Sequence, residues 1–253
     1  MNFLSQLKQR NALLYWFGLF NIAVGIICLI LIQSDDAQIL GVNRWLKPMK
    51  FYFSVGIMTM TMGWLLHYLN NSKKIKRFSW MIVFTMFFEN GLILLQAVRK
   101  TTSHYNVSTS LNGIIFNLMG ILIITFTVVV ISICISFFRQ KTFEIPDAYL
   151  WGIRLGLLFF ILFSLEGGVM IGLLKHTVGG TDGSQGLPLV NWSTQYGDLR
   201  IAHFIGLHSL QVLPLFGNYI SKSKTQTIIF SIAYFVIAAV LFVQALTGTP
   251  LFF

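Results

Sequence analysis

Seven long apolar segments alternate with short polar stretches along the chain. An α-helix rises about 1.5 Å per residue and the hydrocarbon layer of a bilayer is about 30 Å thick, so about 20 mostly apolar residues can cross it. The fourth and seventh segments contain no charged residue, whereas the second and third are close to the lower length limit. The pattern predicts an all-α bundle of seven transmembrane helices in a single domain, residues 1–253, with helices near 13–32, 51–69, 80–97, 113–138, 149–174, 201–220 and 226–246.

Composition supports a multi-pass membrane protein and excludes nucleic acid as a partner. Hydrophobic residues make up 55% of the chain and charged residues only 10%, whereas soluble domains carry about 25% charged residues. The net charge of +10 comes from basic residues in the short stretches between apolar segments, which is a signal of membrane topology. Cys28 and Cys134 each lie inside an apolar segment, so we expect buried thiols without a disulfide.

The basic residues also predict an orientation. If the N-terminus is inside, ten Lys and Arg residues fall on the inner side and seven on the outer side, and the cluster KKIKR at 73–77 is inside. Because positive residues favour the cytoplasmic side, we expect the N-terminus inside and the C-terminus outside. The first apolar segment has the length of a full span and no small-residue cleavage site, so we read it as a retained helix.

Glycine spacing predicts where helices approach closely. The fifth segment contains two small-xxx-small pairs, Gly152/Gly156 and Gly168/Gly172, a pattern that lets a neighbouring helix pack against the backbone. Glycines seven apart recur in the first, second and fourth segments, at Gly18/Gly25, Gly56/Gly63 and Gly113/Gly120. Seven residues are about two turns, so each such pair lies on one stripe of its helix.

Ionisable and amide side chains gather in and beside the apolar segments. The stretch GDLRIAHFIGLHSLQVLP at 197–214 places Arg200, His203, His208 and Gln211 within an arc of about 140° on one helix face. Such groups are costly at membrane depth, so a functional role is their default interpretation. With the predicted orientation, nearly all of them fall in the outer half of the membrane. We therefore predict a pocket that opens outward, lined by Lys50, Glu89, Gln96, Arg99, His104, Glu166, Arg200, His203, His208, Gln211 and Gln244.

The residue types suggest a role for each side chain. Glu89, Glu166 and His208 are the candidates for catalysis, because a lone carboxylate at this depth must be protonated or paired with an arginine or a histidine. Arg99 and Arg200 would supply positive charge, and the remaining residues would orient or contact the ligand. Simpler roles are also open: Lys50 and Arg99 suit snorkelling anchors, His203 suits a cap, and glutamines suit interhelical hydrogen bonds. His67 and His176 have no acidic neighbour in sequence and are read as incidental.

Several functions are compatible with this set of residues. The first hypothesis is a site for a small polar or anionic amphiphile, either a lipid headgroup or a quinone-like molecule, with catalysis left open. The second is a metal-dependent membrane hydrolase with zinc or another transition metal on His104, His203 and His208, although His203 and His208 lack the spacing of H-E-x-x-H. A transporter is the third, but the inner half offers few polar groups. Haem fits less well because only His208 lies well inside a segment, and a retinal pigment is excluded because the seventh segment has no lysine.

Three runs resemble a family of bacterial membrane proteins that has no established activity. They are NRWLKPMKF, QAVRKTTSHYN and GDLRIAHFIGLHSLQVLP, from the second, third and sixth segments and their adjoining loops. The resemblance implies a multi-pass protein of the bacterial inner membrane, in contact with membrane lipids, and supports a shared site. It implies no chemistry.

Overall fold

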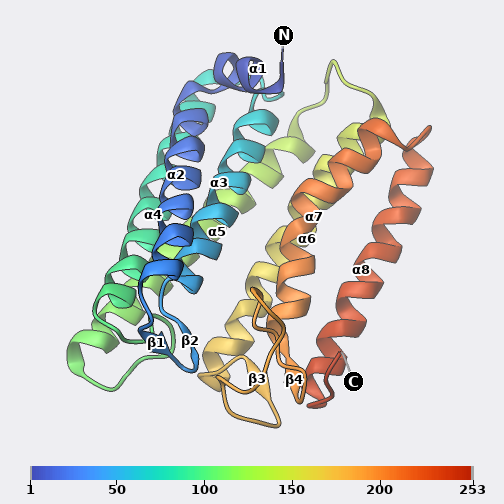
Figure 1. Ribbon diagram of the computed structural model, residues 1–253. Helices are drawn as coiled ribbons and strands as arrows, with labels where there is room; N and C mark the ends of the chain where they lie inside the picture. The colour runs from blue at the N-terminus through green and yellow to red at the C-terminus, as the bar shows by residue number, and fades with distance from the viewer. Residues whose placement is uncertain (1, 252–253) are drawn as a thin grey trace. The chain divides into compact units, whose positions relative to one another are not determined.

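The computed structural model describes residues 2–251, which form α-helices joined by loops and two very short hairpins (Figure 1). The helices are α1 (Phe3–Arg10), α2 (Ala12–Ser34), α3 (Leu46–Leu66), α4 (Ser72–Val98), α5 (Ser110–Arg139), α6 (Asp147–Leu173), α7 (Leu199–Tyr219) and α8 (Lys224–Leu246). The hairpins are antiparallel and pair β1 (Gln38–Ile39) with β2 (Val42–Asn43), and β3 (Thr177–Val178) with β4 (Gly197–Asp198).

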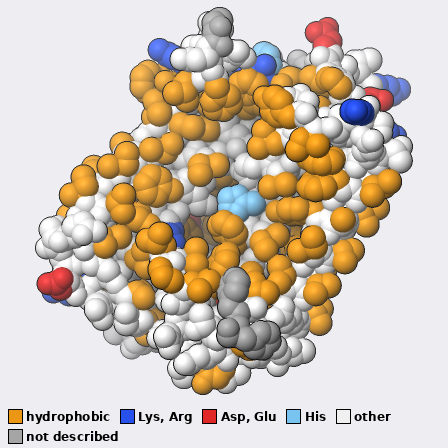
Figure 2. Space-filling view, turned by 45° about the vertical axis from the view of Figure 1, so that its right-hand side comes forward, with side chains coloured by type: hydrophobic (Ala, Val, Ile, Leu, Met, Phe, Trp, Pro, Cys, Tyr) orange, Lys and Arg blue, Asp and Glu red, His pale blue; other side chains and the backbone are white. Residues whose placement is uncertain are grey.

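The all-helical prediction is confirmed, and each predicted segment coincides with one of the helices from α2 to α8. Within residues 2–251, six helices are long and apolar enough to cross a membrane, namely α2, α4, α5, α6, α7 and α8. The chain is thus a multi-pass membrane protein. α3 is not among the six, because Lys47, Lys50 and two threonines lower its hydropathy. In Figure 2, hydrophobic side chains cover most of the middle of the visible face and most charged ones lie toward its ends.

The first helix, α1, was not predicted. It is only eight residues long, and its Ser, Gln, Lys and Arg residues hide it from a search for apolar segments. Asn11 separates it from α2, and the Asn11 side chain accepts a hydrogen bond from the backbone N–H of Leu14. This contact is an N-cap, which fixes the start of α2.

The chain divides into two compact units, unit 1 (Met1–Ile133) and unit 2 (Cys134–Phe253), and α5 runs across the boundary. In unit 1, α2 packs on α3 through the glycines that lie seven apart. A Cβ on Gly18 would lie 2.6 Å from Cγ of Met60, and one on Gly56 would lie 2.9 Å from a side-chain carbon of Ile22. The predicted close approach is therefore present in these two helices, whereas Gly113 and Gly120 of α5 face open space.

In unit 2, α6 and α7 approach backbone to backbone. A Cβ on Gly152 would lie 2.4 Å from the carbonyl oxygen of Leu213, and one on Gly156 would lie 2.8 Å from that of Ser209. The first small-xxx-small pair thus packs as predicted. The second pair does not, since a Cβ on Gly168 or Gly172 would meet no described atom within 4 Å.

Candidate functional site

Glu89 is the most unusual side chain of unit 1. It lies on α4, its residue is 1% exposed, and both carboxyl oxygens are buried without a hydrogen-bond partner. The nearest ionisable contact is Nε2 of His104, which lies 3.9 Å from Oε1, too far for a hydrogen bond. A buried carboxyl group without donors is costly, so its oxygens are acceptors in need of a donor.

His104 connects this carboxyl group to the start of α3. Its Nδ1 lies 3.2 Å from Nζ of Lys47 and 3.1 Å from Oγ of Ser103. Two aromatic rings lie nearby, with the ring centroids of Phe51 and Tyr105 5.7 and 6.0 Å from that of His104. We call Lys47, Phe51, Glu89, His104 and Tyr105 the Glu89 cluster.

The local fold places these residues together. Asp35 accepts hydrogen bonds from Nε1 of Trp45, at 2.7 Å, and from Nε of Arg44. Arg44 also donates to the carbonyl oxygen of Val98 at 3.1 Å, so the turn before α3 is tied to the end of α4. Lys47 follows this turn directly. The Arg44 guanidinium, the indole N–H of Trp45 and the backbone N–H of Ala37 all donate to Asp35 and thus fix the end of unit 1 at which the cluster lies.

Gln96 and Arg99 form a separate network that closes the loop after α4. Arg99 donates to the side-chain oxygens of Gln96 and Asn112, and the amide of Gln96 donates to the same oxygen of Asn112 at 3.2 Å. Asn112 in turn donates to Oγ of Ser108 at 3.1 Å. The predicted ligand residues Gln96 and Arg99 are therefore bound to the start of α5, and they support the loop that carries His104.

Glu166 and His203 form the corresponding pair in unit 2. Nδ1 of His203 lies 3.0 Å from Oε2 of Glu166, while Oε1 of Glu166 is buried without a hydrogen-bond partner. Gly167 makes room for the ring, because a Cβ there would lie 3.2 Å from Cε1 of His203. The histidine side chain is 29% exposed and the glutamate side chain 6%. A carboxylate that holds one ring nitrogen orients the imidazole and fixes its tautomer.

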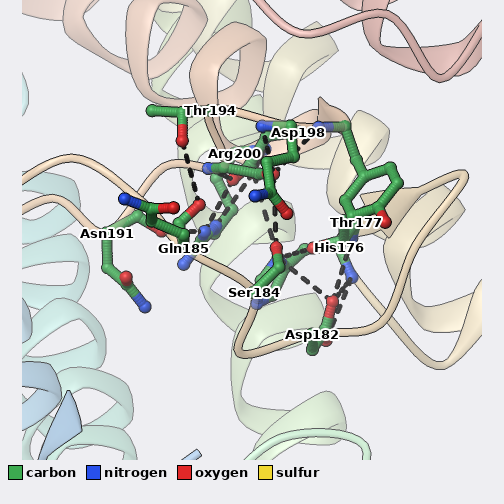
Figure 3. A network of polar contacts seen from close by, with 12 residues as sticks. His176, Thr177, Asp182, Ser184, Gln185, Asn191, Thr194, Asp198 and Arg200 are labelled. Atoms are coloured by element: carbon green, nitrogen blue, oxygen red, sulfur yellow. Dashed lines mark hydrogen bonds and ion pairs between the residues drawn. The ribbon is translucent and has the colours of Figure 1, made fainter. Parts of the chain in front are cut away.

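Asp198 organises the long loop before α7 (Figure 3). It is 1% exposed and pairs with Arg200, whose NH2 lies 2.6 Å from Oδ2, and it also accepts the N–H of Ser193 at 2.8 Å. Arg200 also donates to the carbonyl oxygen of Asn191. Burial raises the pKa of Asp198, but the hydrogen bonds and charge of Arg200, with help from Ser193 and His176, outweigh it and leave the pKa below its usual range.

His176 is part of the same network, which corrects its interpretation as incidental. Its Nδ1 lies 3.3 Å from Oδ1 of Asp182 and 3.9 Å from Oδ1 of Asp198. Asp182 also accepts the backbone N–H groups of His176 and Thr177. The acidic neighbours come from a loop that folds back and from the pairing of β3 with β4, neither of which is visible in local sequence.

The other predicted residues of unit 2 lie apart from the Glu166–His203 hydrogen bond. His208 packs against Phe204, with ring centroids 4.2 Å apart, and Gln211 lies within its hydrogen-bonding reach. Gln244 of α8 donates to the carbonyl oxygen of Pro250 at 2.8 Å and so holds the segment that follows the helix. Arg200, predicted to supply positive charge to the pocket, is the partner of Asp198.

Three contacting residues were missed by sequence reasoning, namely Lys47, Phe51 and Asn112. Lys50, which was predicted to line the pocket, is partly buried on α3, and Lys47 of the same helix contacts His104. Lys47 and Phe51 are four apart and share a helix face, which is the signal that would have selected them. Asn112 lies outside the apolar part of α5, and no sequence pattern marks it.

Metal-ligating side chains do not converge in the part of the chain that the structure describes. Residues 2–251 contain no group of three or more His, Cys, Asp and Glu side chains placed to hold a metal ion. His104 belongs to unit 1, whereas His203 and His208 belong to unit 2.

Comparison with known proteins gives no relative for this chain. No family model, curated protein or solved structure matches it. The family resemblance therefore stays a prediction. The two carboxylate–imidazole pairs, Glu89 with His104 and Glu166 with His203, are the features that bear on function.

Proposed function

We propose that this membrane protein binds a small polar amphiphile at the Glu89 cluster of unit 1, and that the ligand has a quinone-like ring. The observation that carries the proposal is the Glu89 carboxyl group, whose two oxygens are buried and have no hydrogen-bond partner. A ligand hydroxyl that donates to one of these oxygens would offset the cost of leaving them unpaired.

The neighbouring groups narrow the ligand class. Lys47 brings N–H donors to the cluster, and because it donates to Nδ1 of His104, the ring proton of a neutral His104 lies on Nε2, which faces Glu89. A head with both a hydroxyl and a carbonyl oxygen matches donors and acceptor oxygens placed in this way. The burial of the Glu89 carboxyl group favours a neutral head, because a charged head would also have to be desolvated beside it. The rings of Phe51 and Tyr105 both lie near His104, and a flat ring packs well against aromatic side chains. A quinol fits these conditions better than a phosphate-bearing headgroup.

The test is binding of decyl-benzoquinol and decyl-benzoquinone to the purified full-length protein in detergent, followed by tryptophan fluorescence. We expect saturable quinol binding that weakens at least tenfold in Glu89→Gln, because the amide replaces one acceptor oxygen with a donor. Glu144→Gln, at an exposed carboxylate before α6, is the control and should bind as the wild type does.

A second measurement covers other amphiphiles. Mass spectrometry of the molecules that co-purify with the wild type should reveal a hydroxyl-bearing amphiphile that is depleted in Glu89→Gln. If neither quinol binding nor any co-purifying molecule differs between the wild type and Glu89→Gln, the proposal is wrong.

A further inference from the structure

Six basic residues of unit 1 gather at the end opposite the Glu89 cluster. Exposed Lys8 lies on α1, and exposed Lys73, Lys74, Lys76 and Arg77 lie in the first turns of α4. Arg10 donates to the hydroxyl of Tyr68 at 2.9 Å and Asn11 donates to Oγ of Ser79 at 2.8 Å, so the two sequence regions are held together. We call this surface the basic end of unit 1; residues 2–34 and 42–88 contain no Asp or Glu that would neutralise it.

Aromatic and apolar side chains border these charges. Phe3 stacks on Trp64 with ring centroids 5.0 Å apart, and Cζ of Arg10 lies 3.7 Å from the Trp64 ring centroid. Nζ of Lys8 lies 5.2 Å from the ring centroid of Trp16, which is 56% exposed. Phe3 and Leu4 of α1 are 54% and 44% exposed.

This combination is typical of the boundary between lipid tails and headgroups. Tryptophan concentrates at that depth, and a short helix with basic residues and exposed Phe and Leu lies in the plane of the interface. The cationic groups then lie at the level of lipid phosphates, where clustered Lys and Arg attract anionic headgroups.

We propose that the basic end of unit 1 binds the phosphate groups of anionic phospholipids in preference to zwitterionic ones. The site is separate from the Glu89 cluster, because Lys73 and Glu89 are 16 residues apart on α4, or about 24 Å along the axis. Either proposal can therefore fail without the other.

The experiment uses the full-length protein in nanodiscs of equal parts phosphatidylglycerol and phosphatidylcholine, with native mass spectrometry of the lipids that stay bound. We expect phosphatidylglycerol to be enriched on the wild type. The variant K73Q/K74Q/K76Q/R77Q should lose at least two thirds of this enrichment, because it removes four exposed charges from the site.

Two controls make the result decisive. The variant K100Q/K141Q/K222Q/K224Q removes four exposed charges elsewhere and should keep the enrichment. Leu4→Ser, which alters only the apolar border, should reduce it if α1 lies in the interface. Equal losses in the two quadruple variants, no enrichment on the wild type, or complete displacement of the lipid by millimolar inorganic phosphate would each overturn the proposal.

Discussion

At the scale of single residues, the three buried carboxyl groups of Asp198, Glu166 and Glu89 differ in how many hydrogen-bond partners they have. Asp198 has a full set of donors and a guanidinium partner, which is the signature of a structural ion pair. Glu166 has one partner on one oxygen, and Glu89 has none on either. The role of Asp198 is therefore to stabilise the fold. The oxygens of Glu89 and Glu166 that have no partner can accept a hydrogen bond from a donor outside the chain.

The depressed pKa of Asp198 predicts that acid loosens the loop before α7. A carboxyl group whose pKa is lower in the folded state contributes stability that is present above its unfolded pKa, near 3.9, and is lost as pH falls through the folded value. Hydrogen exchange of residues 176–198 should therefore accelerate below about pH 4.

Asp198→Asn is the control for this prediction. It removes the titrating group and leaves Arg200 without its counter-ion, so the loop should already exchange faster at neutral pH. Breaking such a buried pair costs about 3–5 kcal/mol. The same acid-dependent step in the variant and the wild type would show that another group is responsible.

At the scale of helices, the contact between α6 and α7 depends on the absence of side chains. Gly152→Ala should destabilise unit 2 by about 1–3 kcal/mol, since the new Cβ would lie 2.4 Å from the Leu213 carbonyl oxygen and the helices would have to separate. Gly172→Ala is the matched control, because it faces open space and alanine is the better helix former by about 1 kcal/mol. Thermal unfolding in detergent checks both; equal melting temperatures for the two variants would contradict the prediction.

The same helices show which features a sequence can predict. Hydrophobic length located α2 to α8 because a spanning helix must satisfy its backbone hydrogen bonds internally. Most predicted ends lie within three residues of the observed ones, but α3 begins five and α4 eight residues before the predicted start, because their first turns contain lysines. Glycine spacing predicted the faces of α2, α3 and the first half of α6, but not that Gly168 and Gly172 would face open space. Spacing identifies a stripe on one helix and carries no information about the partner.

For the candidate site residues too, some contacts could be predicted from the sequence and others could not. The sequence predicted that a carboxyl group deep in the membrane would pair with an arginine or a histidine, and Glu166 contacts His203 in this way. The partners that depend on chain reversal were not predictable, since Lys47 and His104 are 57 residues apart and Asp182 reaches His176 through a folded loop. Physical chemistry indicated that each group needs a partner, and the tertiary fold determined which one.

At the scale of the whole molecule, the status of α3 determines the topology. If α3 crosses the membrane with the other six helices, the two termini lie on opposite sides; if only the six apolar helices cross, they lie on the same side. We predict seven crossings, because α3 is 21 residues long and buries Met, Leu and Val side chains within unit 1, where a spanning helix needs less apolar surface of its own.

Reporter fusions test this topology. With the basic cluster at 73–77 inside, an alkaline phosphatase fused after residue 253 should be active and a green fluorescent protein fused there should be dark in a bacterial host. Fusions after Ser221, between α7 and α8, should give the opposite pair of signals and serve as the internal control. A fluorescent C-terminal fusion would mean either that α3 does not cross or that the whole bundle is inverted. Fusions at Ala37, between α2 and α3, and at Asn70, between α3 and α4, separate these cases. Inversion places Ala37 inside and Asn70 outside, whereas loss of the α3 crossing with the N-terminus inside places both sites outside.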